Sequence, residues 1–174
     1  MDPLTGKVAA ARVSGMISPK HQVHGYGVNL TVRAIYEVDP VGAVDFGGSE
    51  YRRAGKMPVG TRRRTPEDRY EWWDLGRGSY FVEFNETLEL APDELGLLEP
   101  DERLLHAGAA HAAQFLRGRV APLEALLNVD TVRVQIKMNA RISMLRVFRF
   151  QTAGPALSLP PAPKKLGKAK TKKK

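Results

Sequence analysis

The chain has 174 residues, of which 43% are hydrophobic, and this composition suits one folded domain with a core of its own. It contains no cysteine, which excludes disulfides and thiolate chemistry, and no apolar run approaches the ~20 residues of a membrane-spanning helix. The net charge is +8, but seven lysines and no acid lie in residues 164–174, and 20 basic and 19 acidic residues remain without them. The body is therefore nearly neutral, and the lack of an apolar leader predicts a cytoplasmic protein.

The first third of the chain contains one clear strand pattern. Residues 1–14 show no such pattern, and we expect a lead-in of weak structure there. The alternation in VNLTVRAI, residues 28–35, predicts a strand, and GAVDFGGSEYRR, residues 42–53, predicts a second short strand that ends at a glycine pair. Residues 56–68 are polar and predict a long surface loop. Its run Arg62–Arg64 is typical of a solvated loop, with anion binding as the alternative.

The longest regular pattern lies in the middle of the chain. Residues 70–75, YEWWDL, predict a strand in which one tryptophan faces the core and the other the surface or an interface. Residues 78–90 then alternate between an apolar and a polar face, as a half-buried strand does. The apolar face holds Tyr80, Val82, Phe84, Leu88 and Leu90, and the polar face holds Glu83, Asn85, Thr87 and Glu89. A second short strand is predicted at 95–98.

The last third also reads as short strands. Residues 109–116 suit a helix by propensity alone, but Gly118 and Pro122 limit its length. Residues 123–129 predict a buried strand, and a turn at Asp130–Thr131 leads into two strand halves around Asn139. Many short strands separated by turns favour an all-β barrel or sandwich. From residue 153 the composition becomes rich in proline and lysine, which predicts a disordered tail.

Four segments in this order resemble the dCTP deaminase/dUTPase superfamily, in its archaeal and bacterial form. They are GYGVNLTV (25–32), GAVDFGGSEYRR (42–53), the central block GSYFVEFNETLELAPDELGLLEPDERLLHAG (78–108) and NARISMLRVF (139–148). The resemblance implies a dUTPase-like β-clip barrel over residues 15–152, with strand and hairpin at 109–116. It also implies a homotrimer with active sites between subunits, and dUTP diphosphatase or dCTP deaminase activity.

The residues at the family's functional positions differ from its motifs. The phosphate motif RSSLLRxG falls on residues 101–108, where Asp101, Glu102 and Arg103 replace the arginine and both serines and Gly108 remains. Guanidinium and hydroxyl groups donate to phosphate, whereas two carboxylates repel it. Asp101 and Glu102 therefore fit a solvated turn better than a catalytic pair, and Arg103 would regain one contact only in a shifted register.

The base-binding hairpin of the family, AxWDPGYxG, falls on residues 113–121. Leu116 takes the place of the water-orienting aspartate, Arg119 takes the place of the aromatic residue, and Gly118 remains. A leucine cannot accept a proton or orient water, so the resemblance implies loss of general-base catalysis here.

Further substitutions point the same way. Asn29 replaces the aspartate of GVDLTV, Met144 replaces the glutamine of ARIAQL, and Leu126 lies where the deaminases carry their glutamate. We expect a trimeric binding or structural protein that has lost catalysis. The alternatives are a hydrolase or deaminase with Mg²⁺, using Glu124, Asp101 or Glu102 as the missing carboxylate, and a nucleotide-binding regulator. Glu124 shares the strand face of Leu126 and would have to point inward.

The histidines and the tail complete the candidate sites. His21 and His24 have no third ligand nearby in sequence, so we predict no metal site and no cofactor unless Mg²⁺ serves the hydrolase. His106 and His111 are expected to be structural or surface residues. The tail is expected to bind nucleic acid or another polyanion, or else to be only a solubilising extension. Its cations are Lys164, Lys165, Lys168, Lys170, Lys172, Lys173 and Lys174. The expected partners are other copies of the chain, a polyanion and a deoxynucleotide, without a membrane.

Overall fold

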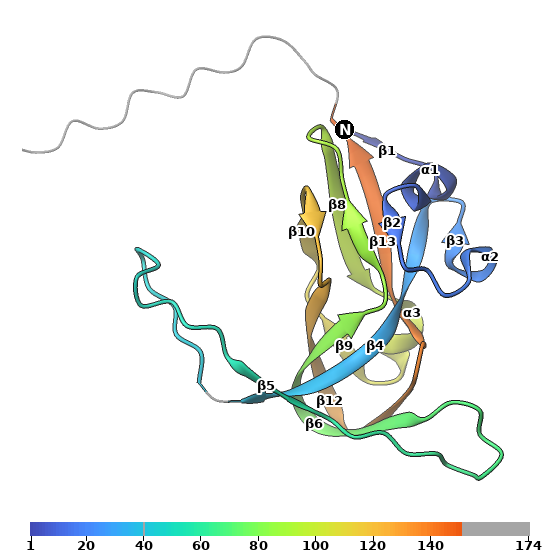
Figure 1. The fold of residues 1–174 in the computed structure, drawn as a ribbon, viewed down its shortest axis with the longest axis vertical. Coiled ribbons are helices and arrows are strands. Elements are labelled where there is room, and N and C mark those ends of the chain that lie inside the picture. The colour runs from blue at the N-terminus through green and yellow to red at the C-terminus, as the bar shows by residue number, and fades with distance from the viewer. Residues whose placement is uncertain (40, 151–174) are drawn as a thin grey trace, which may run out of the picture.

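The fold is a strongly curled antiparallel sheet, seen in a computed structural model that describes residues 1–39 and 41–150 (Figure 1). The predicted tail and its seven lysines lie outside these residues. The main sheet has the strand order β10–β8–β13–β4–β6–β12–β9, with β1 paired to β13 and both β3 and β5 paired to β4. A second sheet has the order β11–β7–β2. The all-β prediction is confirmed.

The elements follow in chain order. The strands of the first half are β1 (Asp2–Pro3), β2 (Val13–Ser14), β3 (Val23–His24), β4 (Gly27–Asp39), β5 (Gly55–Pro58) and β6 (Trp72–Phe84). Those of the second half are β7 (Thr87–Glu89), β8 (Glu94–Pro100), β9 (Ala109–His111), β10 (Gln114–Leu116), β11 (Arg119–Val120), β12 (Glu124–Lys137) and β13 (Arg141–Arg149). The helices are α1 (Gly6–Ala10), α2 (Pro19–Gln22) and α3 (Glu102–His106). None of these helices is long and apolar enough to cross a membrane.

The predicted alternation of the central strand is confirmed, but the strand is divided. All five residues of its apolar face are buried, and between Phe84 and Thr87 the chain leaves the main sheet for the second one. Asn85 holds this transition, since its side-chain amide donates to Thr31 Oγ1 and Asn139 Oδ1, both at 3.0 Å. Glu86, the next residue, is completely buried. Of the two tryptophans, Trp73 is buried and Trp72 is half-buried, as predicted.

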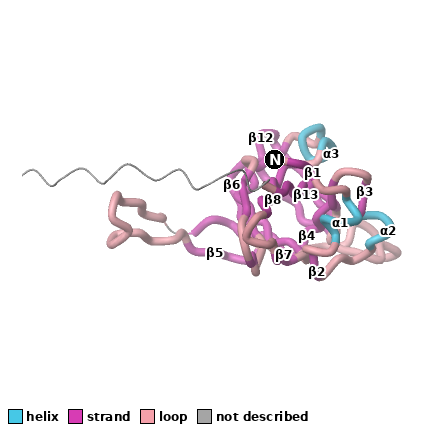
Figure 2. Tube along the Cα trace, turned by 90° about the horizontal axis from the view of Figure 1, so that it is seen from above, coloured by secondary structure: helices cyan, strands magenta, loops and turns pink. Residues whose placement is uncertain are grey.

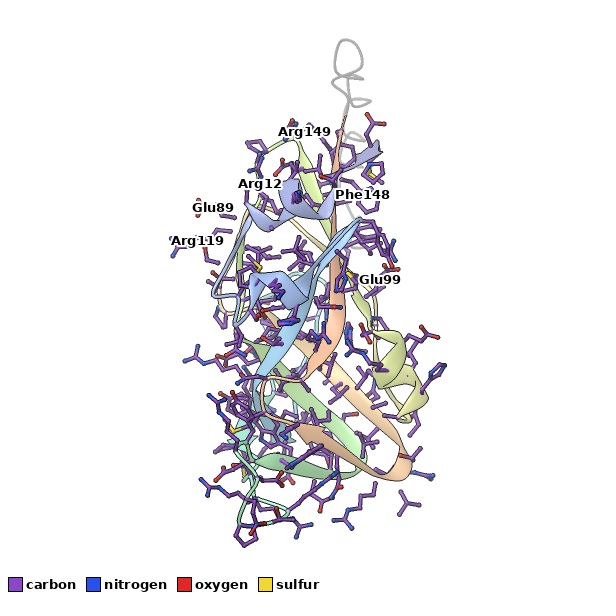
Figure 3. The ribbon with its side chains drawn as sticks, turned by 90° about the vertical axis from the view of Figure 1, so that its right-hand side faces the viewer. Arg12, Glu89, Glu99, Arg119, Phe148 and Arg149 are labelled. Carbon is purple, nitrogen blue, oxygen red and sulfur yellow. The ribbon has the colours of Figure 1, made fainter. Side chains whose placement is uncertain are left out.

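The expectation of weak structure for residues 1–14 is wrong. Ala9 and Val13 are buried in the core, and Arg12 donates to both oxygens of the buried Glu94 carboxylate at 2.7 and 2.9 Å. Arg149 donates to the same carboxylate at 2.7 Å. Figure 3 shows Arg12 and Arg149 together at one end of the molecule. This Arg12–Glu94–Arg149 cluster joins the N-terminal segment to β8 and β13. The domain boundary at residue 15 stays a prediction.

Two further local predictions are corrected. Residues 42–53 form one isolated bridge, Ala43 with Arg52, and not a strand, because no neighbouring strand pairs with them. This arm projects from the body beyond β5 (Figure 2), and Val44 and Phe46 on it are fully solvent-exposed. The turn predicted at Asp130–Thr131 is a register shift inside β12, since pairing with β6 resumes at Arg133. The predicted loop at 56–68 begins only after β5.

Candidate functional site

The phosphate-motif positions line a cavity of about 440 Å³ at the start of α3. Glu99, Asp101 and Glu102 contribute three carboxylates, and Arg146 contributes one cation. The rest of the wall consists of Tyr26, Pro100, Leu105, Ala113 and Met144. We call this cavity the acidic pocket. It brings together three of the predicted site residues, namely Asp101, Glu102 and Met144.

Asp101 serves as the N-cap of α3, because its side chain accepts the backbone N–H of Arg103 at 3.0 Å. The Arg103 guanidinium folds back onto the same carboxylate, with Nε 2.8 Å from Oδ1 and Nη2 3.2 Å from Oδ2. Although burial opposes the shift, these Arg103 contacts and the Asn29 amide lower the pKa of Asp101. Asp101 is therefore an ionised, fully engaged cap, and Glu102 beside it is exposed.

A buried polar network supports Asp101 from behind. Asn29 donates to Asp101 Oδ2 at 3.1 Å, and its own Oδ1 lies 2.5 Å from His24 Nε2. Gln22 bonds the Asn29 carbonyl at 2.9 Å and the Glu86 carboxylate at 2.7 Å. Thr31 donates its N–H and its hydroxyl to Glu86 at 2.9 and 2.6 Å. Asn29 is thus a structural bridge between the core and the helix cap.

His111 and Ser143 form a second buried polar pair. His111 Nδ1 lies 2.9 Å from the carbonyl of Ala112, so this nitrogen carries the proton and Nε2 accepts from the Ser143 hydroxyl at 2.8 Å. Burial lowers the pKa of His111, which favours the neutral ring. Both side chains lie away from solvent and tie β9 to β13, which agrees with a structural role for His111. His106 lies exposed at the end of α3.

The hairpin positions lie apart from the acidic pocket. Leu116 is buried on β10, where it pairs with Gly96 of β8, and Arg119 is exposed opposite Glu89. Gly118 has φ +60°, which suits glycine at this turn. Of residues 113–121 only Ala113 lines the pocket, so the described chain places no hairpin carboxylate or aromatic ring there.

Glu124 does not point inward. It shares the outer face of β12 with the exposed Leu126, and Arg53 and Lys56 both bind its carboxylate. Lys56 also lies 5.1 Å from the ring centroid of Tyr36. Burial, followed by the charge of Arg53, lowers the pKa of Lys56. The predicted use of Glu124 as an inward-facing carboxylate is therefore corrected: it is the centre of an ion cluster between β12 and β5.

Some polar residues of these networks escaped prediction from the sequence. Glu86 carried the clearest signal, since a charged side chain at an apolar position of an alternating strand is either misplaced or paired. Gln22 and Ser143 gave no signal before the fold was known. His21 and His24 do not share a cluster: His21 bonds the Ser18 hydroxyl, and His24 bonds Asn29. No group of three potential metal ligands occurs among the described residues.

Comparison with known proteins decides the family. The chain is 31% identical over 133 residues to a probable deoxyuridine 5'-triphosphate nucleotidohydrolase of Methanosarcina acetivorans, covering 75% of this chain and 74% of the relative. The chain belongs to the dCTP deaminase/dUTPase superfamily. A probable nucleotidohydrolase of the same kind from Methanosarcina mazei is 28% identical over 138 residues, which is 78% of this chain and 77% of that one. No protein-family model matches this superfamily member.

The fold agrees with this assignment. A 2'-deoxycytidine 5'-triphosphate deaminase from Agrobacterium tumefaciens superposes with a TM-score of 0.60 at 15% identity. The match covers 84% of this chain and 48% of the deaminase, so this superfamily member spans about half the length of that chain. The assignment of individual site residues to the superfamily's motifs stays a prediction.

Proposed function

We propose that this superfamily member forms a homotrimer with a binding or structural role, and that it neither hydrolyses dUTP nor deaminates dCTP. One observation carries the proposal. Three carboxylates line the acidic pocket, two of them at phosphate-motif positions, and the guanidinium of Arg103 within the motif is held by Asp101. A triphosphate placed there would meet repulsion from Glu99, Asp101 and Glu102, with Arg146 as the cation of the lining. Arg146 itself donates to Glu99 at 2.8 Å.

The hairpin supports the same conclusion. Enzymes lower barriers by ~8–23 kcal/mol, and a positioned acid or base contributes ~10²–10⁴-fold of the rate. Leu116 supplies no such group, and Glu124 is neutralised by two cations. The proposed role is therefore structural or in binding, with the lysine-rich tail as the polyanion-binding element.

A second candidate is an active nucleotide hydrolase or deaminase, and the identity to probable nucleotidohydrolases favours it. Glu102 is its best general base, since the Glu102 side chain is 81% exposed and is not held by an arginine. Mg²⁺ is usually bound by one or two carboxylates together with substrate phosphates. Glu99 and Glu102 are the residues that could offer such ligands, and the ion would neutralise the phosphates.

The experiment is a panel of dUTP, dCTP, dTTP and dATP with Mg²⁺, in which binding, pyrophosphate release and ammonia release are followed together. We expect no turnover above background. Turnover near ~1 s⁻¹, the lower end of ordinary enzyme rates, would establish the second candidate. In that case Glu102→Gln should abolish activity, whereas Glu89→Gln, on the second sheet, should leave it intact. Tight binding without either product would instead indicate a nucleotide-binding regulator.

A further inference from the structure

A second groove, larger and of opposite charge, lies on the other side of α3. It has a volume of about 580 Å³ and is formed by α3, the end of β12 and the start of β13. Ile17, Leu104 and Ile142 give it apolar surface, and Tyr70 and Trp72 belong to its wall. Its lining contains Arg103, Lys137 and Arg141 and, among the described residues, no carboxylate. We call it the cationic groove.

Two of the three cations of this groove, Lys137 and Arg141, have no close carboxylate partner among the described residues, whereas Arg103 is paired with Asp101. Lys137 lies 5.1 Å from the Trp72 ring centroid and 5.9 Å from that of Tyr70, and Arg141 donates to the backbone carbonyl of His21. Neither forms an ion pair with a described carboxylate. Arg62 and Arg133, by contrast, both pair with Asp74. The carboxylate of Asp68 interacts with Lys137 only through its charge, without a close ion pair. Cations without a close carboxylate partner beside an apolar groove suit an anionic ligand.

An aromatic platform borders the same groove. The Arg64 guanidinium lies 3.6 Å from the Trp72 ring centroid, so the two planar groups are in stacking contact. The indole N–H of Trp72 is buried and forms no hydrogen bond of good geometry. Although burial opposes it, the backbone N–H groups of Arg64 and Thr65, the charge of Lys137 and the Trp72 indole lower the pKa of Asp68. Asp68 therefore stays ionised, and its carboxylate accepts the backbone N–H groups of Arg64 and Thr65 at 3.1 and 3.4 Å, which holds this loop beside Trp72.

We propose that the cationic groove binds a nucleoside phosphate, with the base against the Trp72–Arg64 stack and the phosphate on Lys137 and Arg141. Bases stack on aromatic rings and on guanidinium planes, and phosphate oxygens accept strong hydrogen bonds from cations. The volume lies within the ~300–1,000 Å³ of small-ligand sites. Free nucleotides and the end of a single strand share this chemistry. The site is independent of the acidic pocket and of the tail, so it does not rest on the proposed loss of catalysis.

The test uses the full chain and thymidine monophosphate, followed by tryptophan fluorescence at physiological salt. We expect saturable binding. Thymidine or inorganic phosphate alone should bind at least ~10-fold more weakly, because thymidine lacks the phosphate and inorganic phosphate lacks the base. The double variant Lys137→Gln, Arg141→Gln should bind at least ~10-fold more weakly than the wild type. The control Lys7→Gln removes one positive charge from α1, which lies at the opposite end of the molecule from β6 and β12 (Figure 1), and should bind normally.

A second measurement avoids any variant. Lysine acetylation read by mass spectrometry should show Lys137 protected by thymidine monophosphate and Lys7 unprotected. A short oligothymidylate that binds more tightly than the mononucleotide identifies a single strand as the ligand, and equal affinity identifies a free nucleotide. Equal affinity in the double variant and the control, or no protection of Lys137, overturns the proposal. The proposal is also overturned if the double variant changes the oligomeric state and leaves the affinity for thymidine monophosphate unchanged, since the groove would then be an interface between copies.

Discussion

Replacing Glu94 with glutamine tests how strongly the Arg12–Glu94–Arg149 cluster holds the two ends of the domain together. The Glu94 side chain is completely buried, and it accepts hydrogen bonds from Arg12, Arg149 and the backbone N–H of Ala91. Hydrogen bonds from Arg12, acting against burial, lower the pKa of Glu94 from 4.5 to about 2. The variant keeps the shape of the side chain and removes its charge, so Arg12 loses its carboxylate partner, whereas Arg149 keeps its pair with Asp93.

The pKa shift gives the magnitude. At ~1.36 kcal/mol per pKa unit the shift corresponds to ~3 kcal/mol. The Arg12 and Arg149 side chains are 27% and 45% exposed, so solvent screens part of this energy. We therefore expect Glu94→Gln to lower the free energy of unfolding by ~1.5–3 kcal/mol at pH 7. The pKa is lower in the folded state, so the contribution is present above pH ~4.5 and is lost as the pH falls towards 2.

Urea denaturation at pH 7 and at pH 3.5, followed by circular dichroism, measures both effects. Glu99→Gln is the matched control, because Glu99 is also on β8 and pairs with an arginine of β13, Arg146, at 2.8 Å. That pair is partly exposed, and its loss should cost less than ~1 kcal/mol. The reasoning is refuted if both variants lose the same stability, or if the loss in Glu94→Gln is as large at pH 3.5 as at pH 7.

Four other predictions concern the fold, the assembly and the tail. Gly108→Ala should lower the free energy of unfolding by ~1–3 kcal/mol, because residue 108 has φ +87° and a Cβ there would collide with Thr131. An unchanged free energy of unfolding in urea denaturation would contradict this. The pKa of His111 is lowered in the folded state, so the free energy of unfolding should fall as the pH drops below 6.5, the ordinary pKa of histidine. His111→Leu should make the free energy of unfolding depend less on pH in this range. Light scattering on a chain ending at Gln151 should give a trimer, and a clean monomer would contradict the proposed assembly. Truncation after Pro163 should reduce DNA affinity and its salt dependence, whereas an unchanged salt slope would exclude the tail as the polyanion site.

The sequence predicted most strands because their signal is local. The alternation of residues 78–90 and the apolar run at 123–129 both encode a buried face, and both lie in the core. Residues 1–14 and 42–53 were misread for opposite reasons. The first segment becomes ordered through contacts with β8 and β13, which no local pattern contains. The second has strand-forming residues but lacks a partner strand within the chain.

The candidate site was predicted less completely than the fold. The clustering of Asp101, Glu102 and Met144 followed from the family motifs, and the acidic pocket brings them together. The role of Asp101 as a helix cap depends on the short α3, whose sequence gives little warning of it. Glu124 was misplaced because strand parity says which residues share a face, but not which face is covered. The cations Lys137 and Arg141 gave no signal in the sequence, because which charges pair depends on contacts between distant segments.

The pairing of β1 with β13 has a consequence for how the protein is made. Asp2 lies opposite Arg149, and Leu4 donates its N–H to the Val147 carbonyl at 2.8 Å. Residues 2–4 therefore gain their strand partner only after the intervening residues up to β13 have been synthesised. At ~5–20 residues per second, the ~140 residues between Leu4 and Val147 take ~7–30 s to synthesise. During that interval both β1 and the edge of β4 that pairs with β13 lack this partner, so the two pairings form together when β13 arrives.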